Sequence, residues 1–228
     1  MTWIKICGIK RLQDAETAVA EGANALGFNF WKGTKRYIDP DEAARIVTKM
    51  PASVWCVGVF VDETVERVLE IVRLSGVNCV QLHDSEGPEY LDRLSHLKTF
   101  KVFKVKSNFK PEALLSFPSV TAFLLDAYVE GVPGGTGQAF DWASAVQAKR
   151  YGKVILAGGL NPGNVAKAVE FVQPWGVDVA SGVEVEPGIK CPETIRNFIR
   201  AVKEADKKLL DQSQHSSVAD KNHAHELL

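Results

Sequence analysis

Eight short apolar runs alternate with segments of helical character along almost the whole chain, and this repeat constrains the fold more than any other feature. The runs are rich in Val, Ile, Leu and Phe, and most of them show little alternation of polar and apolar residues. Strands of a parallel sheet that is covered on both faces have this pattern. The runs comprise residues 3–7, 25–30, 54–61, 79–83, 100–105, 121–126, 153–159 and 176–182.

Strands that alternate with helices predict an α/β fold with right-handed crossovers. Eight such units in 228 residues favour a closed (β/α)8 barrel, a TIM barrel, that forms a single domain. An open, doubly wound sheet is the alternative, since the same alternation can produce it. We place the barrel at residues 1–206. The segment 207–228 is polar and, from about Asp211, has little periodicity, so we expect a flexible and dispensable tail.

Residues typical of helix ends mark several of the predicted helices. Asp39 and Asn161 each stand before a proline, which is the arrangement of a capping residue at a helix start. Glycines then occur where helices are expected to stop, because glycine tolerates the left-handed conformation that often ends a helix. These glycines are Gly22, Gly76 and Gly152.

Composition and charge argue against several classes of protein. Apolar residues make up 46% and charged residues 24%, as in soluble globular proteins. The net charge of −1 gives no reason to expect nucleic acid or an anionic membrane as a partner. No apolar stretch approaches the ~20 residues of a membrane span, and no signal peptide is recognisable. The four cysteines are far apart without a CxxC pair, so we expect no metal site, no disulfide framework and a cytoplasmic location.

Polar and glycine residues stand at the ends of the predicted strands, where a barrel of this type carries its chemistry. Each of these residue types suits catalysis or the binding of an anion. They are Cys7, which ends the first run and is followed by Gly8; Arg36, in the loop after the second; His83, at the end of the fourth; Asp126, at the end of the sixth; Gly158 and Gly159, at the end of the seventh; and Ser181 and Gly182, at the end of the eighth.

The last two loops predict a phosphate site. Glycines follow two successive strands directly, as Gly158-Gly159 and as Gly182 after Ser181. Glycine lets backbone N–H groups approach a ligand closely, and in this fold the loops after strands seven and eight often bind phosphate. The alternative is that these glycines only make tight turns.

Cys7 and Asp126 form a candidate base and acid pair, because both would point into the same barrel mouth. A thiol acts as a base only as thiolate, which needs a neighbouring cation or a lowered pKa. Lys5 lies on the same strand face as Cys7 and is a candidate for that cation. The alternatives are that Cys7 is a small buried hydrophobe, that Asp126 caps the glycine-rich loop after it, and that Arg36 is a solvated side chain.

Several motifs, in order along the chain, resemble those of the phosphoribosylanthranilate isomerase family of tryptophan biosynthesis. They are "KICGIK", "GFNF" followed by "KRYI", "VGVFV", "VQLHD", "LLDAY…GGTGQAFDW", "ILAGGLNPGNV" and "GVDVASGVE…GIK", and they run from about Trp3 to Ala205. The resemblance implies a (β/α)8 isomerase without metal or cofactor. Its substrate would be N-(5-phosphoribosyl)anthranilate, and an Amadori rearrangement would give 1-(2-carboxyphenylamino)-1-deoxyribulose 5-phosphate.

The resemblance also assigns roles. The family's general base falls on Cys7, its general acid on Asp126 and its contact to the anthranilate carboxylate on Arg36. Its phosphate-binding backbone falls on residues 158–159 and 181–182. We add His83, at the end of the fourth run, and Asp178, within the eighth, to the residues expected to bind substrate. We expect a monomer or a homodimer that acts on this small molecule.

Four positions depart from the family's usual residues. Ala180 replaces a serine, Lys35 a proline, Cys191 a helix-capping aspartate and Asp84 a glycine, and none of these removes a catalytic group. Two other functions share part of this pattern. The related isomerase of histidine biosynthesis shares the fold but uses aspartate at the position of Cys7. A catalytically silent phosphate-binding barrel would be attractive only if Cys7 or Asp126 were missing.

Overall fold

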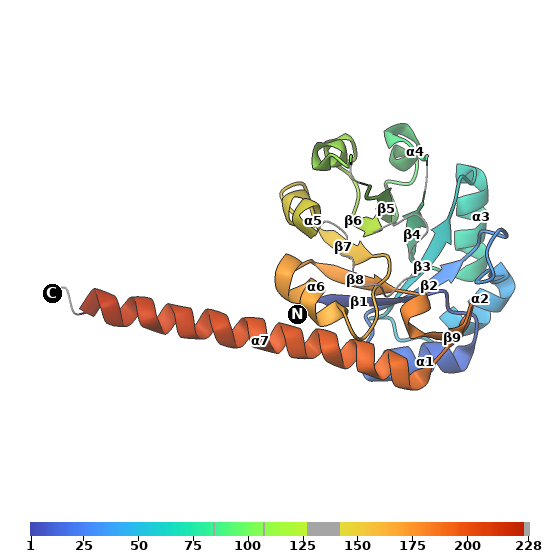
Figure 1. The fold of residues 1–228 in the computed structure, drawn as a ribbon. Helices are drawn as coiled ribbons and strands as arrows, with labels where there is room; N and C mark the ends of the chain where they lie inside the picture. Colours follow the sequence, from blue (N-terminus) through green and yellow to red (C-terminus); the bar gives the residue numbers. More distant parts are fainter. Residues whose placement is uncertain (84, 107, 127–141, 226–228) are drawn as a thin grey trace.

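The computed structural model describes residues 1–83, 85–106, 108–126 and 142–225, with side chains described up to residue 214. Eight parallel strands form a closed barrel in chain order, and β1 pairs with β8 (Figure 1). The predicted barrel is therefore confirmed, and the open sheet is excluded. The strands are β1 (Trp3–Cys7), β2 (Ala25–Asn29), β3 (Trp55–Phe60), β4 (Cys79–Leu82), β5 (Lys98–Lys104), β6 (Ala122–Asp126), β7 (Val154–Ala157) and β8 (Gly176–Val179).

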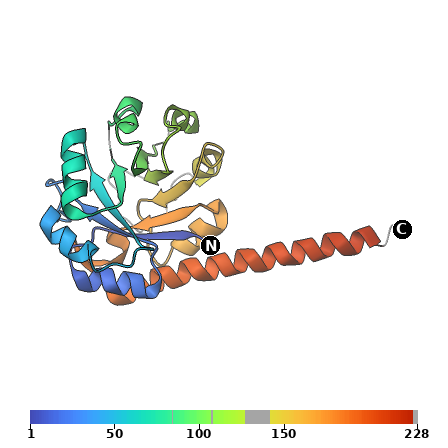
Figure 2. The ribbon, with the colours of Figure 1, turned by 180° about the vertical axis from the view of Figure 1, so that it is seen from behind.

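Helices surround the barrel on its outside (Figures 1 and 2). The α-helices are α1 (Leu12–Glu21), α2 (Pro40–Val47), α3 (Val65–Ser75), α4 (Pro88–Asp92), α5 (Trp142–Ala148), α6 (Val165–Val172) and α7 (Pro192–His225). Two short 3₁₀ turns, η1 (Pro111–Ser116) and η2 (Ser181–Val183), follow β5 and β8. A small antiparallel pair, β9 (Glu184–Glu186) and β10 (Ile189–Lys190), lies between η2 and α7.

Most of the expected helix ends are confirmed. The Asp39 carboxylate accepts from the backbone N–H of Asp41 at 2.9 Å and caps α2, while α1 and α3 end at the left-handed Gly22 and Gly76. The prediction at Asn161 is wrong by three residues. Its carboxamide oxygen accepts from the Gly163 N–H at 2.8 Å and forms a turn, so α6 starts only after this turn, at Val165.

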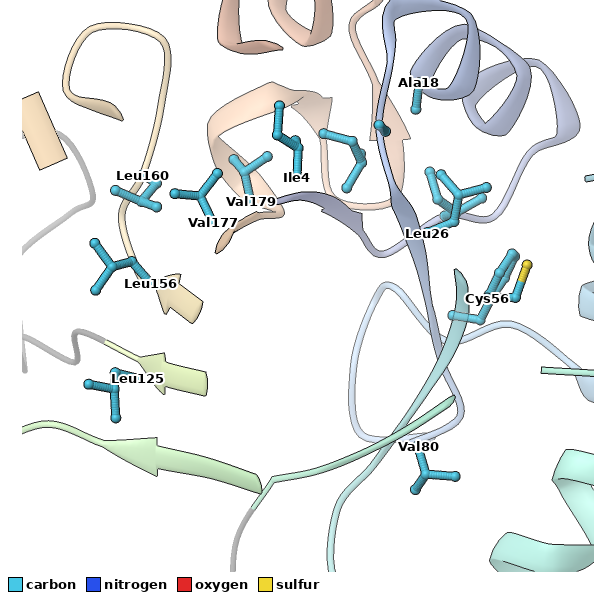
Figure 3. Close-up of a cluster of buried hydrophobic side chains, with 14 of the residues drawn as sticks. Ile4, Ala18, Leu26, Cys56, Val80, Leu125, Leu156, Leu160, Val177 and Val179 are labelled. Carbon is cyan, nitrogen blue, oxygen red and sulfur yellow. The ribbon is translucent and has the colours of Figure 1, made fainter. Parts of the chain in front are cut away.

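Two apolar clusters hold the barrel together. The larger one lies between the outer face of the strands and the helices; Figure 3 draws part of it, with Leu26 on β2, Val177 on β8 and Ala18 on α1. The smaller cluster fills the inside of the barrel with side chains such as Val57 and Phe100. Because strand side chains alternate between the two faces, most strands supply residues to both clusters, whereas the apolar side chains of β8 lie in the outer one alone.

Aromatic rings close the amino-terminal end of the barrel. Trp3 stacks on Trp175 with ring centroids 4.9 Å apart and meets Trp55 edge-on at 5.5 Å. Phe100 packs against Trp3 at 5.6 Å, and the Lys98 ammonium lies 4.6 Å from the Trp55 ring centroid. This end is therefore filled, so a ligand can enter the barrel interior only from the carboxyl ends of the strands.

Helix α7 differs from the expected tail. Its first turns pack on the barrel through buried residues such as Phe198 and Val202, and the Asp206 carboxylate accepts from the Thr2 N–H and hydroxyl, both at 2.7 Å. The helix then continues to His225 and projects away from the barrel (Figures 1 and 2). The backbone from residue 211 to 225 is thus helical, and that this segment is dispensable stays a prediction. Among the described residues, no helix combines the length and apolar character that crossing a membrane requires.

Candidate active site

Cys7 ends β1 with its side chain toward the barrel interior, beside Lys5 on the same strand face. Lys5 is fully buried, its Nζ donates to Asp178 Oδ1 at 2.9 Å, and the neighbouring Cys7 contributes to the raised pKa of Lys5. Gly27 on the neighbouring strand leaves the space that both side chains use, since a Cβ there would lie 2.7 Å from Cys7 Sγ. Lys5 and Cys7 thus lie on one strand face, as expected, and that Lys5 supports a Cys7 thiolate stays a prediction.

The charges around Cys7 oppose one another. Burial raises the pKa of the Cys7 thiol; Lys5 pulls it down, and Asp178 pushes it up again. Burial disfavours the Lys5 ammonium, yet Asp178 and Cys7 together hold the pKa of Lys5 above its usual value. Lys5 thus keeps its charge beside the Cys7 thiol, and a neighbouring cation of this kind favours a thiolate.

Asp126 and His83 lie together at the carboxyl end of the barrel. Asp126 ends β6, follows the inward-facing Ala122 and Leu124 at the alternating spacing of a strand, and has its Oδ2 3.8 Å from His83 Nε2. Burial raises the pKa of the Asp126 carboxyl, and His83 partly offsets this. The glycine-rich loop expected after Asp126 lies outside the described residues, as does Asp84.

Arg36 is held across the site by Glu184, which the sequence analysis did not single out. Arg36 Nε donates to Glu184 Oε1 at 2.9 Å, and Nη2 donates to Oε2 at 2.5 Å. The alternative of a solvated Arg36 is therefore wrong. Although burial opposes ionisation of Glu184, Arg36 and Lys190 together lower its pKa. Gly8 makes room for this arrangement, because a Cβ there would lie 2.8 Å from Arg36 Cδ.

Lys190, on β10, joins three parts of the site. Its buried Nζ donates to the backbone carbonyl of Cys7, to the Ala180 carbonyl at 3.1 Å and to Glu184 Oε1 at 2.8 Å. Burial lowers the pKa of Lys190, while Glu184 acts in the opposite direction. The ammonium ties the ends of β1 and β8 to the carboxylate that holds Arg36.

The two predicted phosphate loops are in direct contact. A Cβ on Gly182 would lie 1.9 Å from the Leu160 carbonyl oxygen, so only glycine allows the loops after β7 and β8 to meet. Gly158 and Gly159 have φ of 79° and 66°, and the space beside Gly159 is open. The Asn164 carboxamide donates to the Gly159 carbonyl at 3.0 Å and fixes this backbone.

The strand-end residues thus lie together at one end of the barrel, and some of them make contacts that the sequence did not predict. Ser181 begins the 3₁₀ turn η2 beside the open backbone of Gly159. Asp178 holds Lys5, so its contact with a substrate stays a prediction. Lys35 takes part only through its carbonyl, which accepts from Lys10 Nζ at 3.4 Å. Among the described residues, no group of His, Cys, Asp and Glu side chains has the arrangement of a metal site.

Comparisons with known proteins identify the family. Residues 4–201 match the family described as "PRAI: N-(5'phosphoribosyl)anthranilate (PRA) isomerase". A protein of that name from Geobacter sp. (strain M21) is 47% identical over 205 residues, covering 89% of this chain and 98% of the relative. Another, from Chlorobaculum parvum, is 43% identical over 217 residues, covering 92% and 98%.

Solved structures agree with this result. The crystal structure of phosphoribosyl anthranilate isomerase from Thermotoga maritima matches with a TM-score of 0.84 and 38% identity over 90% of this chain and 100% of that one. A phosphoribosyl anthranilate isomerase in complex with reduced 1-(o-carboxyphenylamino)-1-deoxyribulose 5-phosphate matches with a TM-score of 0.80 and 37% identity, at the same coverage. Sequence, fold and strand-end residues therefore lead to one conclusion: this chain belongs to the N-(5'-phosphoribosyl)anthranilate isomerase family.

Proposed function

We propose that this chain converts N-(5-phosphoribosyl)anthranilate into 1-(2-carboxyphenylamino)-1-deoxyribulose 5-phosphate, a step of tryptophan biosynthesis. The observation that carries the proposal is the pairing of two groups at one barrel mouth. Cys7 lies beside the buried Lys5 ammonium, and the half-buried Asp126 carboxyl has a raised pKa. A general base with a neighbouring cation and a general acid with a raised pKa are what an Amadori rearrangement requires.

Asp126 acts first. Its carboxyl donates a proton to the ring oxygen of the ribosylamine, the C1′–O bond breaks, and a protonated imine forms at C1′. The raised pKa of Asp126 keeps a larger fraction of this carboxyl protonated at neutral pH than an exposed aspartate would have. His83, whose Nε2 lies 3.8 Å from Asp126 Oδ2, orients the carboxyl.

Cys7 acts second. The imine acidifies the proton on C2′, and the Cys7 thiolate removes it to give an enolamine. The enolamine then gains a proton at C1′ and loses its hydroxyl proton, which yields the ketone. The Lys5 ammonium, held by Asp178 at 2.9 Å, stabilises the thiolate while it exists.

The remaining residues bind the two ends of the substrate. Arg36, fixed by Glu184, has further N–H donors for the anthranilate carboxylate. The contacting backbones of residues 158–159 and 181–182 receive the phosphate. Binding energy from both ends holds C2′ against Cys7.

A fluorescence assay with freshly generated phosphoribosylanthranilate tests the proposal. The wild type should turn over, and Cys7→Ser and Asp126→Asn should each lose about 10²–10⁴-fold in kcat. Cys56→Ser is the control, because Cys56 is an equally buried cysteine in the outer apolar cluster. Activity retained in Cys7→Ser would show that the base is misassigned, and a silent wild type would refute the function itself.

We further propose that the enzyme works in the cytoplasm, without metal or cofactor, as a monomer or a homodimer. One solved relative from Thermotoga maritima is described as a dimeric phosphoribosylanthranilate isomerase from which monomers were generated. The net charge of −1 gives no electrostatic support for binding nucleic acid. Sedimentation of the purified protein at several concentrations distinguishes the two assemblies.

A further inference from the structure

Gln81, on β4, is buried at 3% exposure, and its side-chain oxygen has no hydrogen-bond partner. Within the described part of the chain, Gln81 Oε1 is the only buried side-chain nitrogen or oxygen atom in this condition. Buried polar groups are nearly always satisfied, because an unmet acceptor costs free energy. The unsatisfied Gln81 oxygen inside the barrel therefore points to a hydrogen-bond donor that the described residues do not supply.

Gln81 faces the interior of the barrel, directly beneath the reacting groups. It lies two residues after Cys79, which belongs to the inner apolar cluster, and two before His83, which approaches Asp126 to 3.8 Å. Since side chains two apart on a strand share a face, Gln81 lies between the filled interior and the mouth. Its position is therefore the floor of the site.

The strand registers place Gln81 more closely. Side chains from alternate strands of a (β/α)8 barrel form layers of four. Because the shear of eight is shared by eight strands, the residue at the same height on the next strand is the one that follows the paired residue. Counting in this way puts Gln81 in one layer with Gly27, Leu124 and Asp178. The layer directly above contains Cys7.

Contacts around Gly27 agree with this count. A Cβ on Gly27 would lie 2.7 Å from Cys7 Sγ and 3.1 Å from Lys5 Cε, so the layer of Gln81 lies between these two side chains. The Lys5 ammonium is held by Asp178 on β8, across the barrel from β4. No donor among the described residues meets Gln81 Oε1, and a bound ligand can supply one.

We infer that Gln81 Oε1 accepts a hydrogen bond from the hydroxyl group on C2′ of the sugar, an inference that rests on the proposed function. Cys7 removes the proton from C2′, so the hydroxyl on the same carbon must lie next to the Cys7 thiol. A hydrogen bond from that hydroxyl to the floor of the site turns the C2′–H bond toward Cys7. Gln81 is then a substrate-binding residue that fixes the stereochemistry of proton removal.

Gln81→Met tests the inference, because methionine has a similar length and volume but no strong acceptor or donor. We expect kcat/KM to fall about 10–100-fold, and the affinity for the reduced product, which keeps a hydroxyl at this carbon, to fall about 10-fold. The melting temperature without ligand should stay the same or rise, because the change removes an unsatisfied group. Gln147→Met, the same change on the exposed face of α5, is the control.

Two results would overturn the inference. Wild-type kcat/KM and wild-type affinity for the reduced product in Gln81→Met would show that no ligand group meets this oxygen. A clear fall in melting temperature together with lost activity would show that Gln81 supports the fold instead. A wild type that neither turns over phosphoribosylanthranilate nor binds the reduced product would refute the proposed function, and this inference with it.

Discussion

Adding a single methyl group at Gly27 tests how tightly the structure sets the position of Cys7. In Gly27→Ala the new Cβ would lie 2.7 Å from Cys7 Sγ, 3.1 Å from the Cys7 Cα and 3.1 Å from Lys5 Cε. Non-bonded heavy atoms prefer separations of about 3.5–4.0 Å. The thiol therefore has to withdraw by about 1 Å, and the Lys5 side chain by about half that distance.

The expected loss of activity follows from this displacement. A reacting group misplaced by about 1 Å costs on the order of 10²-fold in rate, so kcat should fall about 10²-fold. Overpacking the barrel interior costs about 1–3 kcal/mol of stability. For a chain of this size, each kcal/mol corresponds to roughly 2–4 °C in melting temperature. We expect the phosphate and the anthranilate carboxylate to bind as before, so KM should change little.

Gly58→Ala separates the two effects. Its Cβ would be equally crowded, at 2.8 Å from Phe60 Cε2 and 3.0 Å from Phe30 Cε2, but it lies on the outer face of β3. Steady-state kinetics and thermal melts on both variants should show similar losses of stability, with a loss of kcat in Gly27→Ala alone. If Gly27→Ala kept wild-type kcat, or if both variants lost kcat equally, the reasoning that Cys7 must be positioned to within 1 Å would be wrong.

Three further changes have defined outcomes. Burial raises the folded-state pKa of Asp126 above its ordinary 3.8, so the protonated carboxyl contributes fully to the free energy of unfolding at low pH, and this contribution is lost as pH rises through the folded-state pKa. Asp126→Asn should therefore melt at a higher temperature than the wild type at pH 7, and the difference should vanish below about pH 4. Glu184→Gln loosens Arg36, so KM should rise about 10-fold with kcat nearly unchanged in steady-state assays. Deleting residues 211–228 should leave kcat/KM and the melting temperature nearly unchanged, because the last apolar side chain of α7 that packs on the core, Leu209, is kept.

The fold could be predicted from the sequence because each strand of a barrel is an apolar run. The run 3–7 has the same bounds as β1, from Trp3 to Cys7. The runs 153–159 and 176–182 are longer than β7 and β8, because their last residues leave the strand to form the two ligand loops. Between the fifth and sixth runs the chain forms the 3₁₀ turn η1 in place of the α-helix that the strand–helix alternation predicts.

The site could be predicted only where its residues follow strands directly. Cys7, Asp126 and the two glycine loops were found in this way. Glu184 and Lys190 were missed, because they lie on a short hairpin after the last strand, where a charged residue is ordinarily solvated. The Lys5–Asp178 pair joins residues 173 positions apart, and no local pattern reveals such a contact. The one available signal was a lysine inside an apolar run, which must find a partner when it is buried.

Charge balance explains why so many ionised groups surround one thiol. Among the described side chains near Cys7, the cations Lys5, Arg36 and Lys190 face the anions Asp178 and Glu184, so one positive charge is in excess. Burial still raises the pKa of Cys7, in opposition to Lys5 and Lys190, which lower it. The excess charge lowers the cost of the thiolate without forming it permanently, because in a buried cluster an uncompensated charge of either sign is expensive.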